Sequence, residues 1–228
     1  MTKKIISLII FCLSIGACSQ ENNFQSLKFS GTLELTEHSL GARAAGRIDS
    51  VSVDEGDEVK EGQLLATLDR FEQAKKDYTR AKELFQEGGV TQQALEYAQL
   101  TLEDQQVVSP LQGVVLVKVH ETGEVVTAGS AVLIIGDRRS LWVRIYVPEG
   151  MINKIELNQP ASLHFDGISE EFSGHVSFIS AQAEFTPRNV QTEEERITQT
   201  FAVKVAMDNP PSYLRPGVAA DVIIEAKK

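Results

Sequence analysis

The chain contains almost no cysteine, has more acidic than basic residues, and shows no familiar arrangement of catalytic side chains. Its two cysteines, Cys12 and Cys18, both lie in the first eighteen of 228 residues, which excludes a disulfide framework or a thiolate metal cluster in the folded part. The 22 Lys and Arg residues are outnumbered by 32 Asp and Glu residues, and the formal charge of −10 argues against nucleic acid as a partner. Because 42% of the residues are hydrophobic, the chain can still bury a core in one or two domains.

The residues that usually carry catalysis or bind metals are scattered. No two of the four histidines have the spacing of metal ligands on a helix, and the three methionines form no soft cluster. Ser169 is followed by two glutamates, which does not fit a nucleophile elbow, and Gly88-Gly89 lacks the Lys and Ser or Thr of a phosphate-binding loop. We therefore expect no enzyme activity, no metal site and no cofactor. The histidines, expected to be structural or surface residues, are His38, His120, His164 and His175.

The N-terminus has the features of a secretory signal over residues 1–17. Lys3 and Lys4 precede an apolar run of eleven residues that is too short to span a bilayer. The run ends in Ile15-Gly16-Ala17-Cys18, which resembles the bacterial lipobox and implies that Cys18 carries a lipid. An ordinary signal cut near Ala17, or an uncut apolar helix, is the alternative. The polar residues 18–26 would then tether the lipid to the fold.

The middle of the chain contains an internal repeat at an offset of 67 residues. Four positions match, and both copies contain the pattern Gly-acid-x-Val-x-x-Gly, with the glycines at turns between apolar strands. Each copy therefore resembles one half of a small β-sandwich. The matched positions are Gly46, Gly56, Val59 and Gly62 in the first copy, and Gly113, Gly123, Val126 and Gly129 in the second.

Two helices are predicted between the two copies, in residues 70–107. This segment is rich in Ala, Leu, Glu, Gln and Lys, contains no proline, and is interrupted at Gly88-Gly89. Apolar residues follow helical spacing in each half, so we expect each heptad-like seam to pack on the other in a helical hairpin. The seams are Phe71, Ala74, Tyr78, Ala81 and Phe85 in the first helix, and Thr91, Leu95, Ala98, Leu102 and Gln105 in the second.

Alternating strands with turn residues between them follow Asp137, a pattern typical of a small β-barrel. In the first of these strands, Leu141, Val143, Ile145 and Val147 should face the core. The stretch that begins at Pro148-Glu149 should form a short helix that ends near Asn158. The polar segment 186–198 is expected to be an exposed loop.

The split repeat, the helical insertion and the barrel together resemble the HlyD-like periplasmic adaptors, also called membrane fusion proteins. The resemblance extends to the barrel motifs Leu141–Glu149 and Leu214–Gly217, while the motif Ala183–Thr192 is similar to the subgroup that works with ABC-type exporters. It implies a mainly β fold with a short α-helical hairpin, a split biotinyl/lipoyl-like sandwich (barrel-sandwich hybrid) and a β-barrel. The implied domains are residues 27–69 and 108–137 for the sandwich, 70–107 for the hairpin, and 138–228 for the barrel, with residues 27–40 available as an additional barrel strand.

The resemblance also implies a docking site at the turn of the hairpin. Adaptors that dock on a TolC-like channel often show Arg, then Leu four residues later, then Ser seven residues after that, and this chain has Arg80, Leu84 and Thr91. The alternative is a solvated Arg, a Leu beside the seam, and a Thr that caps the second helix. Helices of roughly 17 residues would be about 25 Å long, shorter than is typical of the family.

The function implied by this resemblance is that of a periplasmic adaptor in a tripartite efflux or secretion system. Its partners would be an inner-membrane transporter, a TolC-like outer-membrane channel, and further copies of itself in a ring, a hexamer in the family. The family favours anchoring in the inner membrane. Ser19 stands where an Asp would favour retention there, so anchoring in the outer membrane is the alternative. A stand-alone periplasmic binding lipoprotein is the alternative. A biotin or lipoate carrier is disfavoured because the expected hairpin tip has no lysine.

Overall fold

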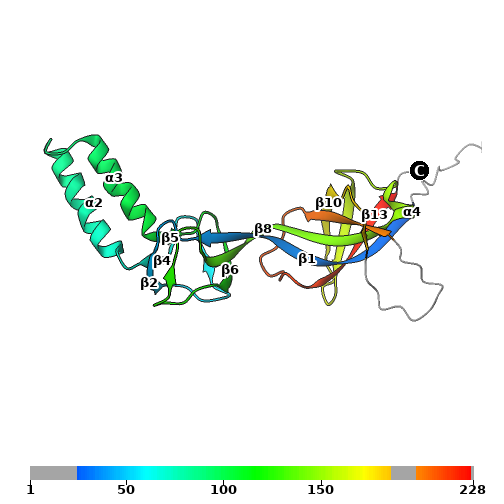
Figure 1. The fold of residues 1–228 in the computed structure, drawn as a ribbon. Coiled ribbons are helices and arrows are strands. Elements are labelled where there is room, and N and C mark those ends of the chain that lie inside the picture. The colour runs from blue at the N-terminus through cyan, green and yellow to red at the C-terminus, as the bar shows by residue number, and fades with distance from the viewer. Residues whose placement is uncertain (1–24, 186–198, 227–228) are drawn as a thin grey trace, which may run out of the picture.

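Two long strands, β1 (Gln25–Gly41) and β8 (Ala131–Pro148), run through two of the three bodies of the molecule. The computed structural model describes residues 25–185 and 199–226. In Figure 1 the helical hairpin, a β-sandwich and a β-barrel follow one another along an elongated molecule, and β1 and β8 connect the sandwich to the barrel. The predicted fold class, mainly β with a short helical hairpin, is confirmed.

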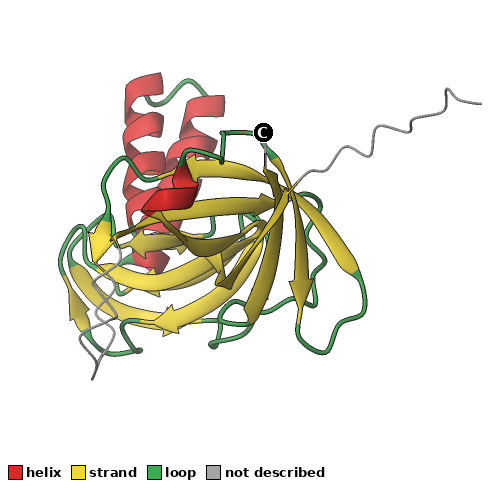
Figure 2. Ribbon diagram, turned by 90° about the vertical axis from the view of Figure 1, so that its right-hand side faces the viewer, coloured by secondary structure: helices red, strands yellow, loops and turns green. Residues whose placement is uncertain are grey.

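Six strands close the barrel, which is seen from its free end in Figure 2. The closure is made by the antiparallel pairing of β12 with β8, so the sheet has no free edge here. The order around the barrel is β8, β12 (Gln199–Met207), β10 (Glu171–Ile179), β9 (Pro160–Phe165), β13 (Ala219–Ala226) and β1, and the two-residue strand β11 (Glu184–Phe185) pairs with the start of β12.

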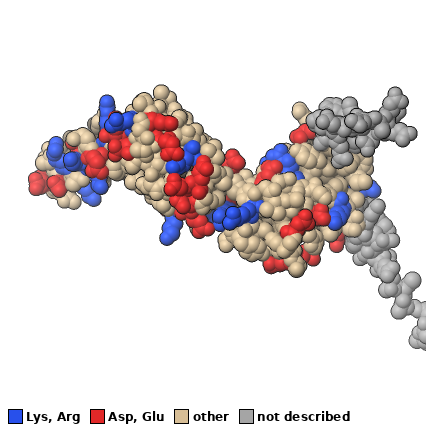
Figure 3. Space-filling view, turned by 90° about the horizontal axis from the view of Figure 1, so that it is seen from below, with Lys and Arg blue, Asp and Glu red and all other residues tan. Residues whose placement is uncertain are grey.

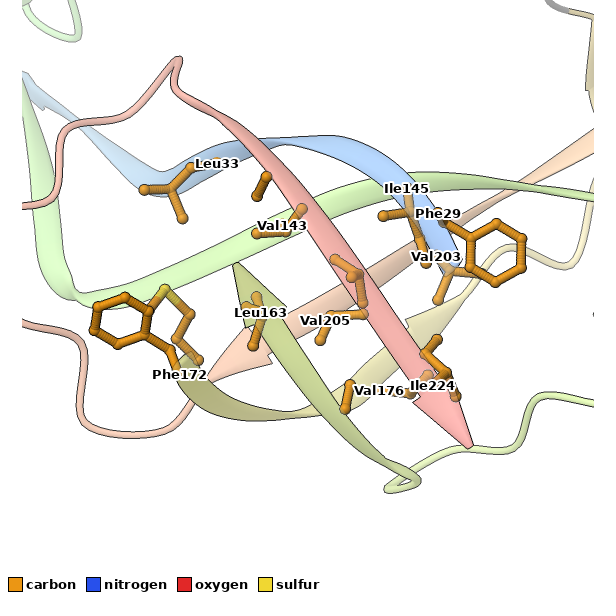
Figure 4. Packing of buried hydrophobic residues seen from close by; sticks show 14 of the residues in the cluster. Phe29, Leu33, Val143, Ile145, Leu163, Phe172, Val176, Val203, Val205 and Ile224 are labelled. Atoms are coloured by element: carbon orange, nitrogen blue, oxygen red, sulfur yellow. The ribbon is translucent and has the colours of Figure 1, made fainter. Parts of the chain in front are cut away.

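Alternation along each strand fills the barrel with apolar side chains. The predicted inward residues Leu141, Val143, Ile145 and Val147 are all buried, because successive residues of a strand point to opposite faces. Figure 4 shows how side chains from every strand of the barrel meet in this core. The predicted short helix is α4 (Glu149–Ile152); it ends at Ile152, before the expected limit.

The sandwich has two small sheets with a second apolar core between them. One sheet combines the inner ends of β1 and β8 with β6 and β3, and the other has the order β5-β4-β2-β7. The bounds are β2 (Gly46–Val51), β3 (Glu58–Val59), β4 (Leu64–Leu68), β5 (Gln106–Val108), β6 (Gly113–Lys118) and β7 (Val125–Val126).

The two copies of the repeat interlock through reciprocal hydrogen bonds. The Gly56 amide donates to the Val115 carbonyl at 2.9 Å, and the Gly123 amide donates to the Ile48 carbonyl at 2.8 Å. The two hydrogen bonds are related by the repeat offset of 67 residues. In each, a turn amide of one copy bonds to a strand carbonyl of the other copy. All four turn glycines, Gly56, Gly62, Gly123 and Gly129, have a positive φ between 78° and 95°, which a residue with a Cβ rarely adopts.

The hairpin is inserted between β4 and β5 and consists of α2 (Phe71–Gln86) and α3 (Gln92–Asp104). The helices have 16 and 13 residues, which corresponds to about 24 Å and 20 Å at 1.5 Å per residue. At the base, the Leu68 amide donates to the Gln105 carbonyl at 2.9 Å, and Arg43 lies 3.7 Å from Glu103. These contacts join the hairpin to the sandwich.

Several predictions fall on segments outside the described ranges: the signal peptide, the lipid site Cys18, most of the tether 18–26, and the loop 186–198. In the rest of the chain, no helix combines the length and the apolar character that crossing a bilayer requires. The sequence offers residues 27–40 as an additional barrel strand, and of these residues 27–32 pair with β13.

Candidate docking surface at the hairpin tip

The seam predicted for the hairpin is its least exposed stripe. Ala74 is buried, and Tyr78, Leu95 and Ala98 are partly buried, whereas most other hairpin residues are exposed. The helices form because their residues have high helix propensity and because this narrow apolar stripe can pack between them. The seam opens toward the tip, where Phe85 is 40% exposed.

A tight glycine turn joins the two helices. The Gly88 amide donates to the Phe85 carbonyl at 3.0 Å, and the Gly89 amide donates to the Leu84 carbonyl at 2.7 Å. Gly88 has a φ of 72°, the left-handed conformation that commonly ends a helix. Thr91 then begins α3, because its side-chain hydroxyl accepts a hydrogen bond from the Ala94 amide at 3.2 Å.

The three predicted docking residues lie on both sides of this turn. The Arg80 side chain is 69% exposed and lies 3.7 Å from Asp77 one turn earlier, a weak surface pair. Leu84 is 38% exposed although it is apolar, and Thr91 is exposed as well as capping α3. The hydroxyl of Thr91 thus performs the capping role given as the alternative, while the docking role of all three residues stays a prediction.

Two exposed apolar residues of α3 were not singled out from the sequence. Tyr97 is 74% exposed and Leu100 is 57% exposed, although both are large. The signal that could have found them is helical spacing, since Leu100 lies two residues from both Ala98 and Leu102 and therefore about 200° from the seam. Single exposed apolar residues are common on protein surfaces, and these two lie about one helical turn apart on α3.

Charge is distributed unevenly over the molecule. Seen from below, Asp and Glu side chains gather over the middle, and the hairpin shows both signs (Figure 3). In the middle region, Lys118 donates to Asp54 at 2.9 Å and lies 3.2 Å from Glu121, and these two hydrogen bonds raise the pKa of its ammonium. Among the described residues, no group of three or more His, Cys, Asp or Glu is placed to hold a metal ion.

Two family models match the chain. The CzcB-like, barrel-sandwich hybrid domain matches residues 36–137, a range that contains β2 to β7 and the hairpin. The CusB-like, beta-barrel domain matches residues 140–228, which contain β9 to β13. The sandwich model thus matches before the barrel model along the chain, in the order expected from the sequence.

A curated relative is similar to a large part of the chain. The UPF0194 membrane protein in the asrC 5′ region of Acidithiobacillus ferridurans is 33% identical over 169 residues, which is 70% of this chain and 49% of the relative. The chain therefore spans about half the length of this curated relative.

Solved structures share the fold at low sequence identity. The periplasmic adaptor protein EmrA aligns with a TM-score of 0.53 and 16% identity, covering 90% of this chain and 99% of EmrA. The membrane fusion protein Spr0693 from Streptococcus pneumoniae R6 aligns with a TM-score of 0.59 and 18% identity, covering 89% of this chain and 100% of Spr0693.

Proposed function

Because the chain belongs to the membrane fusion protein family of periplasmic adaptors, we propose that it is the adaptor subunit of a tripartite efflux or secretion system. It would link an inner-membrane transporter to a TolC-like outer-membrane channel. Copies of the chain would assemble into a ring, a hexamer if this chain follows its family, around the path of the cargo. The transporter would supply the energy, and the adaptor would align and seal the conduit.

The observation that carries this proposal is the linear order of the three bodies. The hairpin lies at one end of the molecule, and β1 begins at the other end, beside the free end of the barrel (Figure 1). A lipid on Cys18 would be seven residues before Gln25, a reach of at most roughly 25 Å. An anchored molecule would therefore hold its barrel near the membrane and direct its hairpin away from it.

The hairpin tip is suited to docking because it presents exposed apolar and cationic groups beside a hydrogen-bonded turn. Leu84 supplies an apolar side chain, Arg80 supplies a guanidinium one turn earlier, and the cap at Thr91 holds the start of α3 in place. A buried apolar anchor beside an Arg is a frequent arrangement at the centre of protein interfaces. The channel would bury Leu84 and pair with Arg80.

The transporter is proposed to be of the ABC type. This part of the proposal rests on the sequence of Ala183–Thr192, which is similar to the adaptor subgroup that works with ABC exporters. The membrane anchor would favour the inner membrane, where such a transporter resides. Contacts to the transporter would fall to the barrel, since the barrel is the body at the anchored end (Figure 1).

The docking step can be tested by site-specific photocrosslinking in living cells. A photoreactive residue is placed at Leu84 or at Thr91, and the captured proteins are identified by mass spectrometry. The matched control carries the same residue at Glu149 on α4, which is exposed on the barrel. We expect both tip positions to capture a TolC-like channel, and the control not to capture it.

Capture of no outer-membrane channel from either tip position would overturn the docking assignment and favour the stand-alone lipoprotein. A second variant, Arg80→Ala, separates docking from mere proximity. With the probe at Thr91, this substitution should reduce channel capture while leaving the amount of adaptor in the membrane unchanged.

A further inference from the structure

The free end of the barrel is closed by the segment between β8 and β9, residues 149–159. Ile155 of this segment is buried, and Ile152 packs partly against the barrel core. Met151 is 40% exposed and Leu157 is 59% exposed, although both are large and apolar. Figure 2 shows α4, which contains Met151, in front of the barrel strands at this end. Two apolar side chains of the segment therefore close the barrel, and two others extend into solvent.

Backbone hydrogen bonds tie this segment to the rim of the barrel. The Lys154 amide donates to the Met151 carbonyl at 3.0 Å, and the Asn158 amide donates to the Val176 carbonyl of β10 at 2.8 Å. Asn158 has a φ of 63°, a left-handed conformation that Asn tolerates better than most residues. The exposed position of Leu157, the residue before this turn, is thus set by a hydrogen-bonded backbone.

Leu157 lies close to the start of β1. The side-chain amide of Gln159 donates to the Glu225 carbonyl at the end of β13, and Glu225 pairs with Ser26 of β1. Neighbouring strands lie about 5 Å apart and two residues span at most about 7 Å, which places Leu157 within roughly 20 Å of Ser26. The chain toward the proposed lipid on Cys18 therefore leaves the barrel beside Leu157.

Tyr146 adds an aromatic ring on the wall of the barrel near the same end. It points outward, because its neighbours Ile145 and Val147 are buried, and it is 39% exposed. Tyr is enriched at the headgroup level of membranes, where its ring and its hydroxyl meet apolar and polar surroundings. We call Tyr146, Met151 and Leu157 the end patch; its aliphatic members lie in the closing segment and its Tyr lies behind them on β8.

The charges of the closing segment favour a zwitterionic over an anionic lipid surface. Residues 149–159 contain two carboxylates, Glu149 and Glu156, and one ammonium, Lys154, which gives a net formal charge of −1. Anionic headgroups would repel this excess of negative charge. Contact with a bilayer would therefore depend on burial of the apolar side chains.

We propose that the free end of the barrel rests in the surface of the anchoring membrane, with Met151 and Leu157 among the acyl chains and Tyr146 at the headgroups. The occupant is a lipid surface because a tether of at most roughly 25 Å holds this end beside the bilayer at high effective concentration. A lipid anchor alone leaves the molecule free to tilt, whereas this second contact would hold the barrel upright. The proposal rests on the lipid anchor of the proposed function.

Nitroxide accessibility tests whether the end patch enters the bilayer. The mature lipidated chain carries Leu157→Cys, labelled with a nitroxide, in vesicles of phosphatidylethanolamine and phosphatidylcholine without any transporter. We expect the label to be more accessible to oxygen, which concentrates among acyl chains, than to a water-soluble nickel chelate. Met151→Asp in the same labelled chain should reverse this preference, because burial of a carboxylate is costly. The charge-matched control, Gln93→Asp on the hairpin, should leave the preference unchanged.

A label at Gln99 on the hairpin is the positional control and should prefer the nickel chelate. The chain without added cysteines accounts for Cys12 and Cys18. Greater access of nickel than of oxygen at Leu157→Cys would overturn the proposal, since the barrel end would then stand clear of the lipid. A label that stays in lipid despite Met151→Asp would overturn it as well, because the label and not the end patch would then enter the bilayer.

Photocrosslinking in cells separates this inference from the proposed function. A photoreactive residue at Met151 that captures an inner-membrane protein in place of lipid would assign the end patch to the transporter and overturn the lipid contact. If the Leu84 probe captures the channel while the label at Leu157→Cys stays in water, the membrane contact fails and the adaptor function stands. A label in lipid without channel capture from Leu84 would instead reject the adaptor function and leave the membrane contact in place.

Discussion

Gly31 is the point on β1 where pairing passes from β13 to β8. It lies opposite Ala220 on one side and Ile145 on the other. A Cβ built on Gly31 would overlap the carbonyl oxygen of Arg144 and lie 2.8 Å from the Cγ2 atom of Ile145. Because Gly31 has no side chain, β1 and β8 can approach each other closely in the wall of the barrel.

Gly31→Ala should lower the free energy of unfolding by about 1–3 kcal/mol, because the extra methyl forces the strands apart. The measurement is urea unfolding followed by tryptophan fluorescence, since Trp142 lies on the same strand as Arg144. Gly150→Ala is the matched control, because a Cβ there meets no atom within 4 Å. Equal destabilisation by both substitutions would contradict this explanation.

Asp221 links β13 to β1 on the outside of the barrel. It lies 2.8 Å from the Lys28 ammonium and accepts a hydrogen bond from the Ser30 hydroxyl at 2.7 Å, and these two contacts lower the pKa of its carboxyl below the ordinary value of 3.8. The stabilisation from the ionised form is therefore present above the ordinary value and is lost as the pH falls through the lowered one.

Asp221→Asn should lower the urea midpoint at pH 7, and the difference from the unmodified protein should shrink as the pH falls below about 3.8. Lys28→Gln should cause a similar loss at pH 7, because it removes the other half of the ion pair. A difference that persists unchanged at pH 2 would mean that Asn disturbs the barrel for reasons other than charge.

At the scale of the element, the hairpin depends on how α3 begins. Thr91 caps the helix through its hydroxyl, and within residues 25–185 and 199–226 no other side chain makes a capping bond at this end. Thr91→Ala should destabilise α3 by about 1 kcal/mol, visible as faster amide exchange over residues 92–104. Thr91→Ser keeps a hydroxyl at the same position and should retain most of the protection. If Ala and Ser exchange equally fast, the cap contributes little to the helix.

The sequence predicts those elements that local patterns control. The offset between the two repeats predicts the paired glycine turns. These turns need a positive φ, which Gly adopts readily, so the glycines recur at the same positions in both copies. The strand Leu141–Val147 is recognisable from alternation alone. The seam of the hairpin follows equally from helical spacing.

What the sequence does not reveal depends on contacts between distant segments. The shared strands β1 and β8 are invisible locally, because nothing in residues 25–41 distinguishes one continuous strand in two bodies from two separate strands. Tyr97 and Leu100 lie outside the predicted seam, and helical spacing alone does not give how much of each side chain is exposed. The candidate docking residues Arg80, Leu84 and Thr91 came from resemblance, because exposed side chains leave no periodic signal.

At the scale of the whole molecule, the junction between sandwich and barrel affects how rigid the molecule is. Of the strands in the described part of the chain, only β1 and β8 cross this junction continuously. Their register shifts there, since Leu35 pairs with Leu141 whereas Thr36 pairs with Asp137. Residues 138–140 of β8 therefore bulge out of the ladder, a feature that bends and twists a strand.

Arg138, within this bulge, joins the two bodies through its side chain. Its guanidinium donates to Glu58 in the sandwich at 3.0 Å and to the Ser212 carbonyl in the barrel at 2.9 Å. The neighbouring Arg139 pairs at 3.3 Å with Asp137 of its own strand. Of these two neighbouring arginines, Arg138 bridges the sandwich and the barrel, whereas Arg139 pairs within its own strand.

Arg138→Gln should widen the distribution of distances between spin labels placed on the hairpin at Gln99 and on the barrel at Lys154. A partly exposed ion pair of this kind contributes up to about 1 kcal/mol, so its loss raises the population of bent conformations by up to roughly fivefold. Arg139→Gln removes the same charge from the same bulge and should leave the distribution unchanged. If both substitutions widen it equally, the stiffness of the junction comes from the net charge or the backbone of β8, and Arg138 has no special part in it.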